Sequence, residues 1–172
     1  PRRQTVRRRE AALAKDSHRE EFASLVTSGS AGLDLAKAAL LIATLEYPNL
    51  NIQRELKTLD DLAAAASPRV NEGEDALYRV NALSEYLFDE LGFRGNREEY
   101  ADPRNSYLND VLEQRLGIPI TLTVLYMDVG RRLGMPLAGV GMPGHFLARH
   151  RDEPDLFIDP FNGGVLLSVD EC

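Results

Sequence analysis

The stretch "GHFLARHRDEPDLFIDPFNGG", residues 144–164, contains two short apolar runs joined by a polar connection with a proline. Its composition predicts two antiparallel strands, "HFLARH" and "LFID". A register that sets His145 directly opposite Asp159 also sets Arg149 opposite Asp155, which pairs opposite charges across the strands. A shift by one residue would put the imidazole and the carboxylate on opposite faces. The pattern therefore predicts that His145 and Asp159 meet.

Strand-like runs continue on both sides of this hairpin, with "LAGVGM" before it and "VLLS" after it. Upstream, residues 118–134 read "IPITLTVLYMDVGRRLG", which is apolar nearly all round for two turns and predicts a buried helix. Pro119 suits the first turn of this helix, where a missing N–H costs nothing. Arg131 and Arg132 in the last turn, followed by Gly134, are typical of a helix end.

The first half of the chain reads as helices with apolar stripes at helical spacing. One such stripe contains Leu40 and Ile42, another contains Leu77 and Val80, and all four side chains are expected to face the core. A further short helix is expected to end at Gly117. Helices first and a small antiparallel sheet last predict an α+β fold. The expected helices cover residues 18–28, 33–47, 51–67, 75–93 and 106–117. The expected regions are a basic arm or helix over 1–19, a helical region over 20–104 and a core over 105–172, with 20–172 as one compact unit.

The composition is that of an ordinary soluble globular protein: 172 residues, 44% hydrophobic and 27% charged. No apolar run approaches the ~20 residues of a membrane span, so no membrane partner is expected. Residues 1–19 carry a net charge of +5 and the remainder −12, which argues against a nucleic-acid surface on the body. The basic arm fits a solvated helix better than a contact with nucleic acid. The single cysteine, Cys172, excludes a disulfide within the chain, so a cytoplasmic location is expected.

A His beside an Asp supplies two of the three groups that activate a nucleophile. The same pair also occurs as a purely structural hydrogen bond. A metal bound by His145, Asp159 and a remote carboxylate has no spacing signature here, so no metal site is predicted. As nucleophiles, Thr121 and Thr123 compete with a structural role in which their hydroxyls bond to the backbone. Nothing in the sequence indicates that Cys172 lies near His145.

The first turn of the predicted buried helix and the predicted hairpin together resemble the transglutaminase-like superfamily, which shares the papain-type cysteine-protease architecture. There, a Gly-x-Cys opens a buried helix, a Gly-x-Pro follows it, a His begins one strand, and an Asp-Pro closes the next. The blocks "NSYLNDVLEQRLGIPITLTVLY", "GVGMPGHFLAR" and "IDPFNGG" are most similar to the SirB-type branch, over residues 33–172. The resemblance implies that His145 is a general base and Asp159 its orienting partner. The cysteine position holds Pro119, which has no nucleophilic atom.

The resemblance implies a transglutaminase-like pseudoenzyme that serves as a binding, scaffolding or regulatory module. Its ligand would be a protein or small molecule in the cleft, and no cofactor is expected. Two alternatives stay open: a hydrolase or acyltransferase that uses the dyad with water or a Thr, and a helical partner-binding domain with a structural His–Asp pair. Glycines at 139, 141, 144, 163 and 164 are expected on the rim of the cleft, more for turns than for ligand contact. The expected binding residues are Asn105, Thr121, Gly144 and Asn162.

Overall fold

The structure is a computed structural model that describes residues 17–27, 33–71 and 73–171. Most of the predicted basic arm, and Cys172, lie outside the described residues. Residues 17–27 are helical, within the first predicted helix. The other helices are α2 (Leu35–Ala43), α3 (Ile52–Ala66), α4 (Ala76–Ser84), the π-helix η2 (Glu85–Glu90) that continues it, η3 (Pro103–Ser106), α5 (Leu108–Gln114), α6 (Pro119–Arg132), η4 (Pro160–Asn162) and η5 (Val169–Glu171).

Three of the N-terminal helices begin at a side chain that accepts a hydrogen bond from a backbone N–H of the first turn. Asp34 caps α2, Asn51 caps α3 and Asp75 caps α4. Such caps satisfy donors that the helix itself leaves unpaired, and each stabilises a helix by about 1 kcal/mol. Local sequence thus fixes where these helices start.

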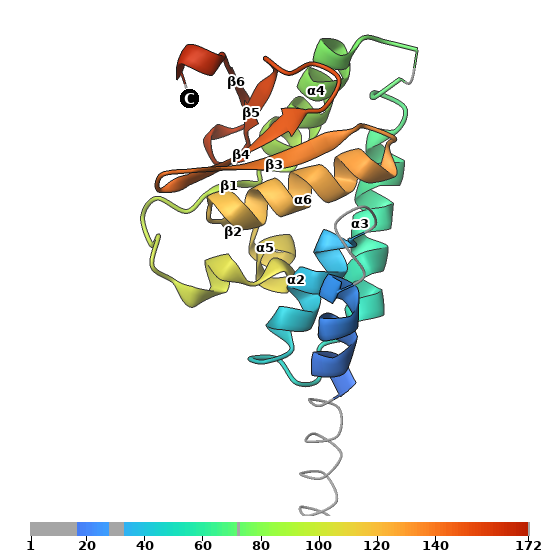
Figure 1. The fold of residues 1–172 in the computed structure, drawn as a ribbon, viewed down its shortest axis with the longest axis vertical. Coiled ribbons are helices and arrows are strands. Elements are labelled where there is room, and N and C mark those ends of the chain that lie inside the picture. Colours follow the sequence, from blue (N-terminus) through green and yellow to red (C-terminus); the bar gives the residue numbers. More distant parts are fainter. Residues whose placement is uncertain (1–16, 28–32, 72, 172) are drawn as a thin grey trace, which may run out of the picture.

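The C-terminal part forms a four-stranded antiparallel sheet in the order β3-β4-β5-β6. Figure 1 shows α6 running beneath this sheet, with α2, α3 and α5 on the other side of the helix. The fold is α+β, as predicted. The strands are β3 (Leu137–Met142), β4 (His145–His150), β5 (Phe157–Asp159) and β6 (Val165–Leu167), and a separate parallel pair joins β1 (Arg94–Gly95) to β2 (Leu116–Gly117).

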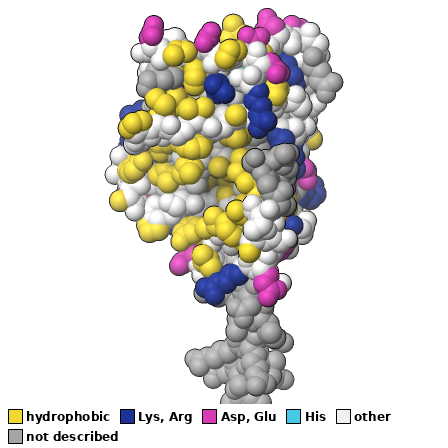
Figure 2. All heavy atoms as spheres, viewed as in Figure 1, with side chains coloured by type: hydrophobic (Ala, Val, Ile, Leu, Met, Phe, Trp, Pro, Cys, Tyr) yellow, Lys and Arg dark blue, Asp and Glu magenta, His cyan; other side chains and the backbone are white. Residues whose placement is uncertain are grey.

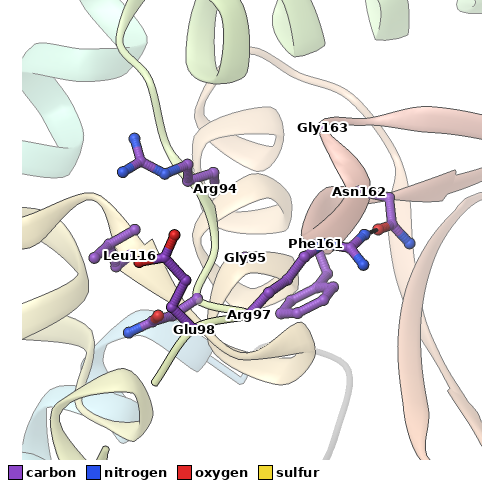
Figure 3. A pocket seen from close by; sticks show the side chains of 9 residues that line it. Arg94, Gly95, Arg97, Glu98, Leu116, Phe161, Asn162 and Gly163 are labelled. Atoms are coloured by element: carbon purple, nitrogen blue, oxygen red, sulfur yellow. Dashed lines mark hydrogen bonds between the residues drawn. The ribbon is translucent and has the colours of Figure 1, made fainter. Parts of the chain in front are cut away.

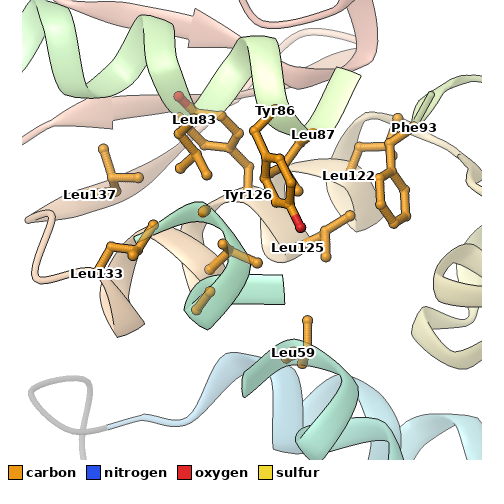
Figure 4. Close-up of a cluster of buried hydrophobic side chains, with 14 of the residues drawn as sticks. Leu59, Leu83, Tyr86, Leu87, Phe93, Leu122, Leu125, Tyr126, Leu133 and Leu137 are labelled. Carbon is orange, nitrogen blue, oxygen red and sulfur yellow. The ribbon is translucent and has the colours of Figure 1, made fainter. Parts of the chain in front are cut away.

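The hydrophobic core surrounds α6 and draws side chains from the N-terminal helices and from the sheet (Figure 4). Tyr126 of α6 is fully buried and stacks on Phe88 with 5.8 Å between ring centroids. Its hydroxyl donates to the carbonyl of Val80 at 3.0 Å and lies 3.1 Å from Ser84 Oγ. Burial raises the pKa of Tyr126 well above its ordinary value. These contacts hold α6, and with it the first turn at Pro119, in a fixed place.

Three local predictions were wrong. Ile42 and Leu77 do not face the core, because their side chains are 45% and 48% exposed. The helix before α6 does not end at Gly117: α5 ends when Arg115 adopts a left-handed conformation with φ 59°. Gly117 instead pairs with Gly95 in the small parallel sheet.

The register of the predicted hairpin is displaced by two residues. Arg149 pairs with Phe157, and Ala148 pairs with Ile158, so Arg149 does not oppose an acidic residue. A displacement by two residues leaves every side chain on its face, because the side-chain period of a strand is two. The two polar side chains of the hairpin are therefore diagonal neighbours, still within reach of each other.

No helix among the described residues is both long and apolar enough to cross a bilayer.

Candidate functional site

His145 and Asp159 form a hydrogen bond, as predicted. The distance from His145 Nε2 to Asp159 Oδ2 is 2.8 Å. The Asp159 side chain is 5% exposed, whereas that of His145 is 27% exposed. Because Oδ2 acts as the acceptor, Nε2 carries the proton of this bond in the neutral ring, and Nδ1 is left with its lone pair. The imidazole is thus oriented by a buried partner while part of it stays open to solvent.

Asp159 is held by three further hydrogen bonds from the turn that follows it. Its Oδ1 accepts from the backbone N–H groups of Phe161 and Asn162 at 3.1 and 3.2 Å. Its Oδ2 accepts from Asn162 Nδ2 at 2.7 Å. Asp159 therefore caps η4 and orients His145 with the same carboxylate. Asn162, one of the expected binding residues, supports the dyad directly.

The ring of Phe161 lies at the centre of the site. It meets His145 edge to face at a centroid distance of 6.0 Å and Tyr100 in the same way at 6.0 Å. The guanidinium of Arg97 lies 5.4 Å from the ring centroid and also donates to the side-chain oxygen of Asn162 (Figure 3). A Cβ at Gly95 would come within 2.5 Å of the ring, so only glycine permits this approach.

A hollow of about 620 Å³ opens beside the His–Asp pair, and we call it the dyad hollow. A neighbouring hollow of about 510 Å³ lies over β1, and Figure 3 shows the side chains that line it. Arg97, Phe161 and Asn162 line both and form the wall between them. The dyad hollow is lined by Arg97, Met142, Pro143, His145, Leu147, Asp159, Phe161, Asn162, Leu167 and Glu171.

Asn105 and Thr121 lie together but do not line either of these hollows. Asn105 is 2% exposed; its Nδ2 donates to the carbonyls of Glu99 and Tyr100 at 2.7 and 3.2 Å. Its Oδ1 accepts from Asn96 Nδ2 at 3.0 Å. Thr121 Oγ1 lies 2.7 Å from the carbonyl of Asn105 and donates to it. Both residues thus fix the loop that carries Tyr100 to the site.

The other two candidate positions in α6 have buried side chains. Thr123 is fully buried, and its hydroxyl donates to the carbonyl of Phe146 at 3.1 Å. Pro119 is the first residue of α6, as predicted, and is buried. α6 packs directly against β4 and η4, the elements that carry His145 and Asn162. Both threonine hydroxyls are therefore engaged with backbone groups.

The glycines of the predicted rim have different roles. Gly144, Gly163 and Gly164 have positive φ angles and form turns. Gly163 lines the hollow over β1, and Gly139 lines a different hollow near α6. Among the described residues, no three His, Cys, Asp or Glu side chains lie close enough together to hold a metal ion.

The sequence matches the family described as the transglutaminase-like superfamily over residues 53–172, which is more than half of the chain. The chain belongs to the transglutaminase-like superfamily. The match includes α6, the four-stranded sheet and both members of the dyad. No solved structure matches the chain.

Curated relatives of this transglutaminase-like chain include proteins named only as UPF0162. One from Xylella fastidiosa (strain 9a5c) is 46% identical over 149 residues, covering 86% of this chain and 53% of the relative. One from Vibrio cholerae is 35% identical over 136 residues, covering 78% and 48%. The mouse protein F-box only protein 21 is 37% identical over 118 residues, covering 63% and 19%. The chain spans about half the length of the UPF0162 relatives.

Sequence reasoning missed Arg97, Tyr100 and Phe161. Arg97 and Tyr100 come from the polar loop after η2, more than forty residues before His145. Phe161 lies within the block "IDPFNGG", whose Asp-Pro was recognised but whose aromatic residue was not. The only local signal was an aromatic residue directly after an Asp-Pro turn.

Proposed function

We propose that this domain is a transglutaminase-like pseudoenzyme of the SirB-type branch, and that it binds a protein or small-molecule ligand in the dyad hollow. It acts as a binding, scaffolding or regulatory module in the cytoplasm. It retains the base and the orienting carboxylate of the family but not the nucleophile.

The observation that carries the proposal is the position of Pro119. It is the first residue of α6, a buried helix that packs against the strand of His145. A cysteine at a helix N-terminus beside a His has a lowered pKa and is a strong nucleophile. Proline has no atom that attacks a carbonyl. We propose that the ring of Pro119 faces the imidazole and fills the place of the missing thiol.

The hydrogen bonds of the threonines argue against a substitute nucleophile. A Thr acts as a nucleophile only when a base lies within hydrogen-bond reach of its hydroxyl. Thr121 and Thr123 donate instead to the carbonyls of Asn105 and Phe146. An attack by either would first require breaking its hydrogen bond to the backbone. Water activated by His145 is the remaining hydrolytic route.

The dyad hollow offers a mixed surface to a ligand. Apolar groups come from Met142, Pro143 and Leu147, and polar groups come from His145 and Arg97. The imidazole is 27% exposed and accepts a hydrogen bond at Nδ1 or, when protonated, donates one. Apolar and polar groups that converge on one concave site are typical of ligand sites.

A pair of measurements tests the proposal. The first is the release of ammonia from casein and the incorporation of a fluorescent amine into it, with wild type and His145→Ala. We expect both proteins to stay at the buffer background. A wild-type rate above background that is lost in His145→Ala would overturn the pseudoenzyme and support the hydrolase.

The second measurement is an NMR fragment screen that follows the side chain of His145 and the backbone amides of Phe161 and Asn162. We expect the fragments that bind to shift these signals. Fragments that cluster elsewhere and leave these signals unchanged would favour a purely structural dyad.

A further inference from the structure

The free edge of the sheet at β3 has unpaired backbone groups. In the β3–β4 ladder, Leu137 pairs with His150, and the backbone N–H of Arg151 bonds to the carbonyl of Pro136 at 2.8 Å. Hydrogen-bonded pairs alternate with non-bonded pairs in an antiparallel ladder. From this starting point, the N–H and C=O groups of residues 137, 139 and 141 point away from β4, towards the free edge.

Two of these three positions are open. At Leu137 the N–H bonds to the carbonyl of Met135 at 3.0 Å, and the C=O accepts from Arg151 Nε at 3.3 Å. Gly139 and Gly141 are exposed, and no partner for their outward N–H and C=O groups is found within the described part of the chain. Two successive open positions, spaced by two residues, match the ladder of an added strand.

Nothing in β3 protects this edge. Natural edge strands commonly carry Lys, Pro or an inward-pointing charge, and these prevent pairing with another chain. The strand reads "LAGVGM" and contains none of these. Its glycines have no side chains to obstruct an approaching backbone. The edge therefore has the features of a strand that receives a partner.

An apolar hollow of about 510 Å³ lies beside the first half of β3. Its apolar lining comes from Leu33, Leu35, Met127, Met135 and Leu137, and it reaches Gly139. Figure 2 shows hydrophobic side chains gathered over the region of this face where Figure 1 places β3 and α6. Methionine side chains adapt their shape to a bound apolar group.

The charges at this hollow favour an acidic partner. Arg131 and Arg151 line it. The Arg131 side chain is 55% exposed, and no carboxylate pairs with Arg151 among the described residues. Asp128, the only acidic residue of the lining, is 1% exposed and is shared between Arg131 and Arg132. Two cations at the rim of an apolar hollow select a carboxylate next to an apolar side chain.

We propose that an extended peptide segment adds to β3 as a fifth strand, pairing with Gly139 and Gly141. It places a large apolar side chain in the hollow and an acidic residue against Arg131 and Arg151. This recognition mode uses main-chain hydrogen bonds for affinity and side-chain sites for specificity. The β3 strand contains no acidic residue, so a second copy of β3 cannot supply the carboxylate. This surface is separate from the dyad hollow and goes beyond the proposed function.

The probe is a fluorescein-labelled heptapeptide, Thr-Val-Thr-Val-Leu-Glu-Glu, whose apolar and acidic end reaches the hollow when the peptide runs antiparallel to β3. We expect saturable binding by anisotropy and slower hydrogen exchange at the amides of Gly139 and Gly141. The amides of Ala138 and Val140 already face β4 and should not change. The same peptide with Lys-Lys in place of Glu-Glu, or with N-methylated alternate residues, should bind at least about fivefold more weakly.

A matched pair of variants tests the ladder itself. Gly141→Pro removes the outward N–H, and proline is tolerated at an edge position whose N–H does not enter the native ladder. Gly141→Ala keeps the N–H, and its Cβ meets nothing closer than 3.9 Å. We expect Gly141→Pro to weaken binding about tenfold and Gly141→Ala to leave it within about twofold. Arg131→Gln should weaken binding, and His145→Ala should not.

Four outcomes would overturn the proposal. The first is that the probe does not bind, and the second is that Gly141→Pro and Gly141→Ala bind it equally. The third is that the peptide slows hydrogen exchange at residues of the dyad hollow instead of β3. The fourth is that the protein forms a dimer in which the amides of Gly139 and Gly141 are already protected from exchange without peptide. The exchange data on the wild-type protein decide the matter even where the proline variant does not fold. Failure here leaves the proposed function of the dyad hollow untouched, because its tests do not involve β3.

Discussion

The substitution Asp159→Asn keeps the shape of a side chain that is 5% exposed and replaces one carboxylate oxygen with an NH₂ group. Asp159 accepts four hydrogen bonds, two at each oxygen. The amide oxygen of the variant retains the two bonds from the backbone of η4. Its NH₂ group replaces Oδ2 and faces two donors, the Nε2 of His145 and the Nδ2 of Asn162.

The expected loss of stability follows from the two hydrogen bonds to Oδ2 that this substitution removes. A hydrogen bond to a charged group stabilises a protein by about 1.5–3 kcal/mol. The imidazole can switch tautomer and accept from the new amide, so one of the two bonds is recovered in a weaker, neutral form. Asn162 cannot turn its amide without losing its bond with Arg97. We therefore expect a decrease of about 2–4 kcal/mol in the free energy of unfolding.

Urea unfolding followed by far-UV circular dichroism measures this decrease. The matched control is Asp155→Asn, an exposed Asp in the connection between β4 and β5, which should change stability by less than about 0.5 kcal/mol. Nitrogen NMR of the His145 ring should show the proton moving from Nε2 to Nδ1 in Asp159→Asn. An Asp159→Asn protein as stable as the control, with an unchanged tautomer, would refute the reasoning about this network.

Two further predictions concern other parts of the chain. The hydrogen bond of Tyr47 to Asp110 at 2.7 Å raises the pKa of Tyr47 to about 12. This hydrogen bond therefore stabilises the fold fully below the pKa of an unfolded Tyr, about 10, and its contribution is lost as the pH rises from about 10 through about 12. Tyr47→Phe should lower the free energy of unfolding by about 1–2 kcal/mol at neutral pH. In urea melts at rising alkaline pH, the variant should lose less stability than the wild type. An identical dependence on pH in both proteins would contradict this. Gly164→Ala should cost about 2–4 kcal/mol, because φ is +76° and the new Cβ would lie 2.4 Å from Ser84 Oγ. Gly163→Ala, with φ +74° and nothing within 4 Å of the new Cβ, should lower the free energy of unfolding by only about 1 kcal/mol. Equal losses of stability in thermal melts of the two variants would contradict the steric argument.

The positions of the longer helices and of the four strands of the C-terminal sheet were predictable from local patterns, whereas the short pair β1–β2 was not. Helix starts follow from caps such as Asp34, and the strands follow from short apolar runs between turn residues. The prediction that His145 and Asp159 share a face was correct although the register was displaced by two residues. Apolar and polar alternation repeats every two residues, so it cannot distinguish two registers that differ by two.

The remaining features depend on contacts between distant parts of the chain. The Arg97–Phe161 contact joins a loop to a turn more than sixty residues away, and no local pattern records it. The left-handed Arg115 was missed because a glycine was expected to end that helix. The exposed position of Ile42 reflects which faces of α2 the neighbouring helices cover, which periodicity alone does not determine.

The most direct test of the central proposal is the thiol pKa of Pro119→Cys in a Cys172→Ser background. The rate of alkylation by iodoacetamide is measured against pH, with His145→Ala in the same background as the control. A thiol at the N-terminus of α6, facing a His held by Asp159, should have a pKa below the ~8.5 of a free cysteine. We expect this lowered pKa and its return towards the ordinary value in the control. A thiol that titrates like a free cysteine, or that is too buried to react, would contradict a vacated catalytic site.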